Sequence, residues 1–286
     1  PRRGRGLQSA LMDEPQFDDS GLDDGPLPRR KPRKGLYVLP NLFTLAALFG
    51  GFYAIVMAMN GRFENAAIGI FCAMVLDSLD GRVARMTGTQ SAFGEQMDSL
   101  SDMVSFGAAP ALVVYEWALK DFGKIGWIVA FVYCACAALR LARFNVNTGV
   151  VDKAWFQGLP SPAAAALVAG AVWVSVEAGS NQKHEVWLHW LMLGITAYAG
   201  LTMVTNAPFY SFKSFSLKKS VPFTVLVVLV LLIALVSSHP PIALFALFCC
   251  YGISGYVVYA QRKWKGRYAS LTATSTDEPD EAGLHH

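Results

Sequence analysis

An uncharged run of 21 residues opens the apolar part of the chain: Leu39-Pro-Asn-Leu-Phe-Thr-Leu-Ala-Ala-Leu-Phe-Gly-Gly-Phe-Tyr-Ala-Ile-Val-Met-Ala-Met59. A helix needs about 20 mostly apolar residues to cross a bilayer, so this run predicts a membrane-spanning helix. Seven further apolar runs follow it, and the first two of these contain aspartates. The eight predicted spans cover residues 39–59, 64–81, 97–117, 125–144, 160–178, 187–205, 221–238 and 241–261.

The composition of the whole chain agrees with these spans. Of the 286 residues, 53% are hydrophobic and 16% are charged, whereas a soluble domain carries about 25% charge. We therefore expect an all-α, polytopic integral membrane helix bundle of about eight transmembrane helices, and neither a soluble enzyme nor a disordered or fibrous protein. The formal net charge of +3 is too small to indicate a nucleic acid partner.

Lysine and arginine positions set the orientation of the predicted spans, because cytoplasmic loops carry an excess of both. With both termini in the cytoplasm, 20 of the 24 basic residues fall on the cytoplasmic side. The skew predicts an even number of spans and cytoplasmic termini. The basic N-terminal arm leads into a full-length apolar run, so we expect no cleavable signal peptide, and Met12 is a candidate start of the natural chain.

Four aspartates lie within 26 residues of this charge-poor chain: Asp77, Asp80, Asp98 and Asp102. The first pair is three residues apart and the second pair four, so each pair shares one helix face. A short polar loop joins the two predicted helices, which predicts antiparallel neighbours with facing carboxylates at the cytoplasmic boundary. Ionised carboxylates in an apolar setting repel each other, and divalent cations are the simplest remedy. Oxygen-only ligands favour Mg²⁺, Mn²⁺ or Ca²⁺ over zinc, and such a cluster can bridge two ions.

The residues next to the aspartates indicate a phosphate-bearing ligand. Gly81 and Ala84 continue the helix face of Asp80 and leave room for a flat or phosphorylated group to approach the backbone. The guanidinium of Arg85 is suited to neutralise phosphate oxygens. Gly94 lies one helical turn before Asp98.

Together these residues fit the pattern D-x2-D-G-x2-A-R-x8-G-x3-D-x3-D at every fixed position. The pattern is the signature of the CDP-alcohol phosphotransferase family, which the chain resembles from about residue 37 to 260. The resemblance implies a six-helix core, here with two added helices, and a homodimer. It also implies an enzyme that moves a phosphatidyl-type group from a CDP-linked lipid to an alcohol and releases CMP.

Residue roles follow from the same resemblance. It implies a two-metal site with the ligands Asp77, Asp80, Asp98 and Asp102. Asp102 resembles the catalytic base that takes the proton of the acceptor hydroxyl. Five residues resemble the surface that binds the CDP-lipid: Asp80, Gly81, Ala84, Arg85 and Gly94.

Two further patterns concern the acceptor alcohol. Arg140-Leu-Ala-Arg143-Phe-Asn145 and Phe156-x-Gly-Leu-Pro-x-Pro162 resemble the phosphatidylserine synthase branch of the family. This resemblance implies CDP-diacylglycerol as the donor and L-serine as the acceptor. Because a guanidinium is the natural partner of a carboxylate, the candidate acceptor-binding residues are Arg140, Arg143, Asn145 and Lys213. Basic residues at a cytoplasmic helix end are also expected from orientation alone.

Within this framework the chain divides into three parts. Residues 1–36 predict a disordered cytoplasmic arm, residues 37–261 a transmembrane catalytic domain, and residues 262–286 a basic and then polar cytoplasmic tail. Small residues in the first and fifth spans, among them Gly50, Gly51 and Ala163–Ala166, permit the close helix packing that a dimer uses. We expect the protein in a bacterial inner membrane, in contact with membrane lipids, with its active site facing the cytoplasm.

Two alternatives remain open at this point. One keeps the chemistry and changes the acceptor to glycerol phosphate, inositol phosphate or choline, since the pair Arg140 and Arg143 suits either kind of acceptor. The other is a proton- or cation-coupled transporter, because carboxylates inside a membrane commonly mark ion pathways. A transporter, however, is expected to spread its carboxylates across the membrane depth.

Overall fold

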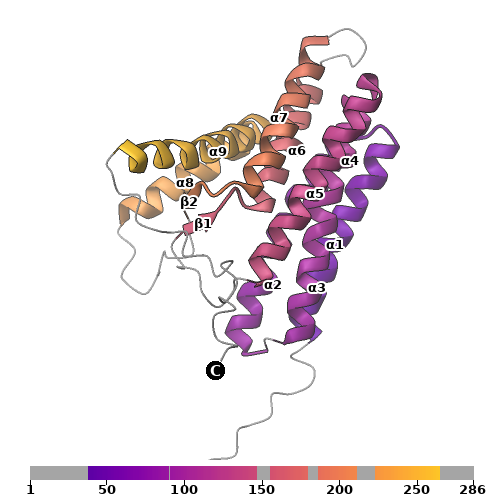
Figure 1. Cartoon of the computed structure of the whole chain (residues 1–286). Coiled ribbons are helices and arrows are strands. Elements are labelled where there is room, and N and C mark those ends of the chain that lie inside the picture. Colours follow the sequence, from indigo (N-terminus) through magenta and orange to yellow (C-terminus); the bar gives the residue numbers. More distant parts are fainter. Residues whose placement is uncertain (1–37, 90, 147–154, 180–185, 211–222, 265–286) are drawn as a thin grey trace, which may run out of the picture.

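The computed structural model describes residues 38–89, 91–146, 155–179, 186–210 and 223–264. Its α-helices are α1 (Val38–Met59), α2 (Phe63–Thr87), α3 (Ala92–Asp102), α4 (Ala109–Trp117), α5 (Lys124–Val146), α6 (Ser161–Glu177), α7 (Val186–Val204), α8 (Phe223–Ser238) and α9 (Pro240–Trp264). A π-helical turn, η2 (Met103–Ala108), joins α3 to α4, and a 3-10 turn, η3 (Leu119–Phe122), follows α4. Two short strands, β1 (Trp155–Gln157) and β2 (Pro208–Tyr210), pair antiparallel. The predicted helical bundle is therefore confirmed (Figure 1).

Helix α6 forms the centre of the bundle. Twelve of its 17 residues are buried, and half of these are alanine. Helices α2, α4, α7 and α9 all pack against it. Small side chains let helix backbones approach closely, which replaces the hydrophobic driving force that is missing between helices in lipid.

The small residues of the first predicted span are also used within one chain. A Cβ on Gly50 would lie 3.0 Å from the carbonyl oxygen of Gly69 in α2, and a Cβ on Gly51 would lie 2.6 Å from the Cα of Ser105. The alanines Ala163–Ala166 are likewise buried inside the bundle. These positions therefore explain the packing of α1 and α6 and give no support to a dimer.

Four described segments are long and apolar enough to cross a membrane: Leu39–Met59, Lys124–Val146, Val186–Val204 and Pro240–Gln261. Helix α6 is apolar but shorter, and α2 carries its aspartates and arginines in its C-terminal half. Large apolar side chains stay exposed on these helices, as a lipid-facing surface requires. The chain is an integral membrane protein, and the count of eight spans and the cytoplasmic termini stay predictions.

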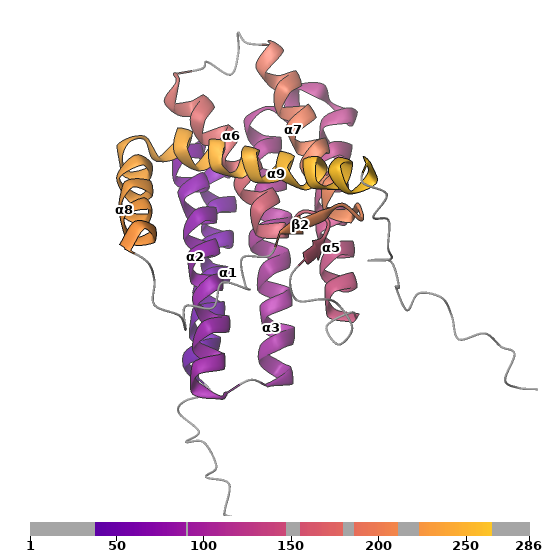
Figure 2. The same ribbon diagram turned by 90° about the vertical axis from the view of Figure 1, so that its left-hand side faces the viewer.

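Helix α9 does not run parallel to the other helices of the bundle. Residues 241–261 are helical as predicted, but Figure 2 shows α9 crossing the outside of the bundle at a steep angle to α1 and α2. Aromatic contacts hold it there: the ring of Phe248 lies 6.3 Å from that of Phe71 in α2. In addition, the Tyr198 hydroxyl of α7 donates a 3.0 Å hydrogen bond to the Gly252 carbonyl. This crossing brings the middle of α9 to the end of α7 that carries β2.

A glycine fixes the entry into α6. Gly158 follows β1 with φ +77°, and a Cβ there would lie 2.3 Å from the Met203 carbonyl oxygen, so only glycine fits. The Gly158 amide donates to the Ala207 carbonyl and the Leu159 amide to the Thr202 carbonyl, at 2.9 and 3.1 Å. These bonds tie the start of α6 to the end of α7, and they set the position of Ser161 at the first turn of α6.

Candidate active site

Three of the four aspartates converge. One carboxylate oxygen from each of Asp77, Asp98 and Asp102 lies within 4.8 Å of the others. Asp77 comes from α2, and the other two come from α3, with α1 packed against both helices. The Oδ1 atoms of Asp98 and Asp102 are buried and have no hydrogen-bond partner among the described residues. Such unpartnered anionic oxygens fit a hard divalent cation, because a cation supplies the missing positive charge.

Asp80 interacts with Asp98 of this cluster and is also held by the first helix. The Thr44 hydroxyl of α1 donates a 2.8 Å hydrogen bond to Asp80 Oδ2, and both residues are almost fully buried. The Ser101 hydroxyl of α3 in turn donates to the Thr44 backbone carbonyl at 3.1 Å. Thr44 therefore links the helix of the first aspartate pair to the helix of the second pair.

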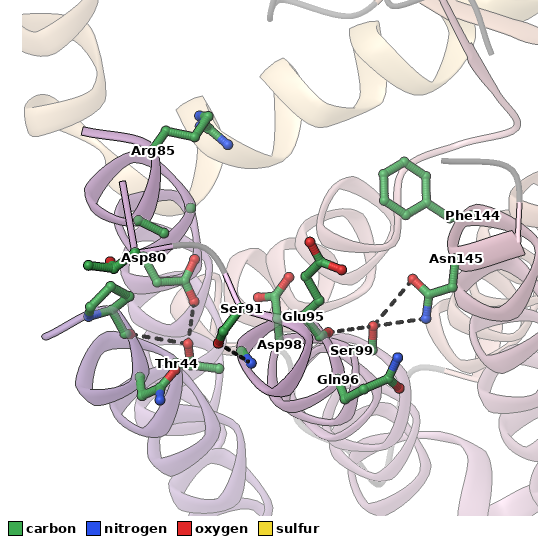
Figure 3. Close-up of a pocket in the computed structure, with 16 residues that line it drawn as sticks. Thr44, Asp80, Arg85, Ser91, Glu95, Gln96, Asp98, Ser99, Phe144 and Asn145 are labelled. Carbon is green, nitrogen blue, oxygen red and sulfur yellow. Dashed lines mark hydrogen bonds between the residues drawn. The ribbon is translucent and has the colours of Figure 1, made fainter. Parts of the chain in front are cut away.

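A cavity of about 340 Å³ lies beside the aspartates, between α1, α2, α3 and the end of α5. Figure 3 shows the carboxylate of Asp80 on one side of it, with Asp98 and Asn145 on the other. All five residues predicted to bind a CDP-lipid line it: Asp80, Gly81, Ala84, Arg85 and Gly94. The volume lies in the range of about 300–1,000 Å³ that is typical of small-ligand sites.

The loop between α2 and α3 sets the two walls of this cavity. Helix α2 ends at Gly88, whose left-handed conformation (φ 63°) lets its amide donate to the Ala84 carbonyl. Helix α3 begins at Ser91, whose hydroxyl accepts a 3.1 Å hydrogen bond from the Gly94 amide. The short connection turns the chain back so that Gly94 and Asp98 of α3 line the same cavity as Asp80 of α2.

Gly81 is important for the shape of the α2 wall. A Cβ at this position would lie 3.4 Å from Nη1 of Arg85, one turn further along the helix. A Cβ here would be in van der Waals contact with the guanidinium, so the glycine leaves open space beside Arg85. Arg85 itself is exposed and is within electrostatic range of Asp80.

A family model described as CDP-alcohol phosphatidyltransferase matches residues 37–198, which include the four aspartates and every residue that lines the cavity. The chain belongs to the CDP-alcohol phosphatidyltransferase family. It is therefore an enzyme of this family, as its signature predicted.

Curated relatives in this family extend the match beyond residue 198. The CDP-diacylglycerol–serine O-phosphatidyltransferase of Helicobacter pylori strain J99 is 37% identical over 229 residues, 79% of this chain and 94% of the relative. The enzyme of the same name from Mycobacterium tuberculosis strain CDC 1551 is 31% identical over 249 residues, 85% of this chain and 86% of the relative. An archaetidylserine synthase from Methanothermobacter thermautotrophicus is 42% identical over 132 residues, 46% of this chain and 55% of the relative. The predicted resemblance to the phosphatidylserine synthase branch is confirmed.

The residues predicted to bind the acceptor alcohol do not lie together in the structure. Nη1 of Arg140 donates a 2.6 Å hydrogen bond to the Ser161 hydroxyl, and its guanidinium is in electrostatic range of Asp102 and of Tyr251 in α9. Its Nε atom is buried with no hydrogen-bond partner in the described ranges. Arg140 therefore presents a charged donor next to the aspartate cluster.

The other three candidates lie elsewhere. Nη2 of Arg143 donates to the Asn206 side-chain oxygen at 2.9 Å, which ties it to the end of α7. Asn145 lines the cavity beside the aspartates and donates a 2.9 Å hydrogen bond to the Ser99 hydroxyl (Figure 3). Lys213 lies outside the described residues. Of the three described candidates, Arg140 is the one with a buried donor atom that has no hydrogen-bond partner among the described residues, beside the aspartate cluster.

The sequence did not lead us to assign a site role to three polar residues that the structure places here. Thr44 is the one serine or threonine in the uncharged run 39–59, and this is the signal that could have pointed to it. Ser99 carries no signal beyond its place between the last two aspartates. Ser161 lies within the F-x-G-L-P-x-P pattern, but its contact with Arg140 depends on the packing of α5 against α6.

Proposed function

We propose that this enzyme transfers the phosphatidyl group from CDP-diacylglycerol to the hydroxyl of L-serine, giving phosphatidylserine and CMP. The observation that carries the proposal is the convergence of Asp77, Asp98 and Asp102 beside a cavity lined by all five predicted CDP-lipid residues. The names of the relatives, which match most of this chain, support serine as the acceptor.

The α2 wall of the cavity would receive the nucleotide end of the donor. Gly81 and Ala84 lack bulky side chains, so the diphosphate can approach the helix closely. Arg85 is placed to pair with the phosphate oxygens, and a guanidinium can do so through two parallel hydrogen bonds. Thr44 keeps the Asp80 carboxylate turned toward the cavity through its 2.8 Å hydrogen bond.

A divalent metal fits the aspartate cluster. We propose two ions, Mg²⁺ or Mn²⁺ with Ca²⁺ as a further candidate, held by Asp77, Asp80, Asp98 and Asp102. The all-oxygen donor set and the two buried carboxylate oxygens without partners support this assignment. When bound, such ions neutralise the charge of the diphosphate.

The transfer step needs a proton acceptor, and we assign this role to Asp102. The Asp102 carboxylate takes the proton of the serine hydroxyl while the serine oxygen forms a bond to the phosphorus that carries diacylglycerol. The bond between this phosphorus and the bridging oxygen breaks, and CMP leaves with that oxygen. A general base of this kind contributes roughly 10²–10⁴-fold to the rate.

Arg140 would hold the serine. Its guanidinium lies near Asp102, so a serine carboxylate bound there would present its hydroxyl close to the base. Ser161 fixes one edge of the guanidinium and leaves Nε for the ligand. Arg143, Asn145 and Lys213 remain secondary candidates for acceptor or lipid phosphate.

The membrane arrangement belongs to the same proposal. The protein would be a homodimer in a bacterial inner membrane, with eight spans and both termini in the cytoplasm. The distribution of basic residues supports this orientation. The donor lipid would enter from the bilayer and serine from the cytoplasm.

CMP release by the purified full chain tests the proposal directly. The enzyme is given CDP-diacylglycerol and, in parallel, L-serine, glycerol phosphate, inositol phosphate or choline. We expect release that depends on L-serine. Release that depends on another alcohol would reassign the acceptor, and cation flux in liposomes without CMP production would favour the transporter.

A further inference from the structure

The helix that carries Asp98 and Asp102 is irregular immediately after them. Residues Met103–Ala108 form a π-helical turn, in which the Ala109 amide donates to the carbonyl of Val104, five residues back. Such turns insert one residue into an α-helix and are frequent at functional sites. The sequence predicted a single regular span over 97–117, so this turn is a finding of the structure.

Pro110 explains why the helix widens at this point. In a regular α-helix the carbonyl of Phe106 would accept a hydrogen bond from the amide of residue 110, and proline has no amide hydrogen. The proline ring also clashes with that carbonyl, which favours a wider turn. The π-helical turn η2 is thus encoded locally by the proline at the start of α4.

Tyr133 supplies the donor that proline lacks. Its hydroxyl, on α5, donates a 3.0 Å hydrogen bond to the Phe106 carbonyl, and both side chains are fully buried. A buried carbonyl without a donor is costly, so this hydroxyl stabilises the widened turn. On the opposite side, the Ser105 hydroxyl donates to the Ala47 carbonyl of α1 at 3.0 Å, and Gly51 leaves the space that Ser105 occupies.

The turn adjusts the relative rotation of two helix faces. Each residue of an α-helix rotates the chain by about 100°, so one inserted residue shifts the following face by that angle. Helix α4 is fixed by the core, where Val113, Val114 and Trp117 are buried. If η2 became a regular α-helix, α3 would have to rotate and turn Asp98 and Asp102 away from Asp77.

We propose that Tyr133 is a positioning residue for the aspartate cluster. It acts through the Phe106 carbonyl and the π-helical turn, and it keeps Asp102 and Asp98 directed at Asp77. This inference rests on the proposed function, because it assigns a catalytic consequence to the direction of these carboxylates.

The test compares Tyr133→Phe with the matched control Tyr198→Phe in the full chain. Both changes remove a tyrosine hydroxyl that donates to a helix carbonyl at 3.0 Å, but Tyr198 bonds to Gly252 in α9. We expect kcat to fall about tenfold or more in Tyr133→Phe, because small misplacements of reacting groups strongly lower the reaction rate. The α2 wall is untouched but α3 also lines the cavity, so the KM for CDP-diacylglycerol should change less than kcat. Tyr198→Phe should keep the wild-type kcat.

A second measurement does not depend on turnover. Mn²⁺ binding without substrate, followed by electron paramagnetic resonance, should weaken in Tyr133→Phe and stay unchanged in Tyr198→Phe. Wild-type kcat together with wild-type Mn²⁺ affinity in Tyr133→Phe would overturn the inference. Absence of CMP release by the wild-type enzyme would instead overturn the proposed function.

A substitution of Pro110 distinguishes an effect on the position of the aspartates from an effect on the stability of the protein. Pro110→Ala restores the amide opposite the Phe106 carbonyl and allows a regular helix. In the double variant Tyr133→Phe/Pro110→Ala we expect the thermal unfolding temperature to recover while kcat stays low. Recovery of kcat as well would show that the π-helical turn is dispensable and would overturn the inference.

Discussion

The two sides of the aspartate cluster differ in how they meet a ligand. On the α2 side, Gly81 and Ala84 form a cavity wall, and Arg85 is exposed at its edge. On the α5 side, the Arg140 guanidinium lies close to Asp102, with one nitrogen bound to Ser161 and Nε buried without a partner among described residues. The first side suits a large ligand that keeps contact with solvent, whereas the second suits a small anionic group that fills a defined place.

This difference teaches where specificity lies in such an enzyme. The α2 side comes from one continuous stretch of sequence, so its chemistry follows from local spacing. The α5 side is assembled from α5, α6 and α9, which are distant in sequence. We therefore assign the donor to the local side and the choice of acceptor to the assembled side, and the experiments below challenge that division.

We expect the largest effect from removing divalent metal, because the proposed metal ligands lie between the α2 side and the α5 side. Dialysis against EDTA should abolish CMP release, because unneutralised carboxylates and diphosphate repel each other. Activity should return when Mg²⁺ or Mn²⁺ is added in excess of the chelator. CMP release that persists in EDTA would contradict the metal assignment.

The next effect concerns the base that lies between the two sides. Asp102→Asn should lower kcat roughly 10²–10⁴-fold, because the amide cannot accept the proton of the serine hydroxyl. Binding of CDP-diacylglycerol should be largely retained, since none of the five residues of the α2 and α3 cavity wall is changed. CMP release and donor binding, measured on the same preparation, report the two quantities.

Asp121→Asn is the matched control for this variant. Asp121 is an exposed aspartate in η3, next to His189, and it lies outside the aspartate cluster. It should keep the wild-type kcat. Full turnover by Asp102→Asn would refute its role as the base.

The two arginines provide the sharpest contrast between the sides. Arg140→Gln should raise the KM for serine by about 10–100-fold, the range expected for the loss of a hydrogen bond to a charged group. The KM for CDP-diacylglycerol should change little. Arg85→Gln should show the reverse pattern with a smaller rise, because solvent screens the exposed guanidinium.

Arg82→Gln is a suitable control for both arginine variants. Arg82 is an exposed arginine of α2 between Gly81 and Ala84, and it is absent from the cavity lining. Its loss should leave both KM values near those of the wild type. A rise of both KM values in Arg140→Gln and in Arg85→Gln would mean that donor and acceptor share one site, against the division proposed here.

The same division describes how far sequence reasoning reaches. The aspartates and the residues Gly81 and Arg85 could be placed because spacings of three and four residues fix a helix face. The contact between Arg140 and Ser161, the steep crossing of α9 and the bond from Tyr133 to Phe106 could not, because each joins distant helices. Pro110 is the one local sign of the π-helical turn, and its effect becomes visible only with the core packing of α4.

We expect the smallest effect from a substitution of Thr44, and we expect it in the affinity for the donor. Thr44→Val keeps the shape of the side chain and removes the 2.8 Å hydrogen bond to Asp80. Such a bond is worth about 1 kcal/mol, so the affinity for CDP-diacylglycerol should fall roughly fivefold, with the KM for serine unchanged. The backbone carbonyl that accepts from Ser101 is unaffected, so α1 and α3 stay linked.

Thr196→Val, which removes a buried hydroxyl that donates to Met192 within α7, is the control and should leave donor affinity unchanged. Equal losses in both variants would show that Thr44 stabilises the bundle without orienting Asp80.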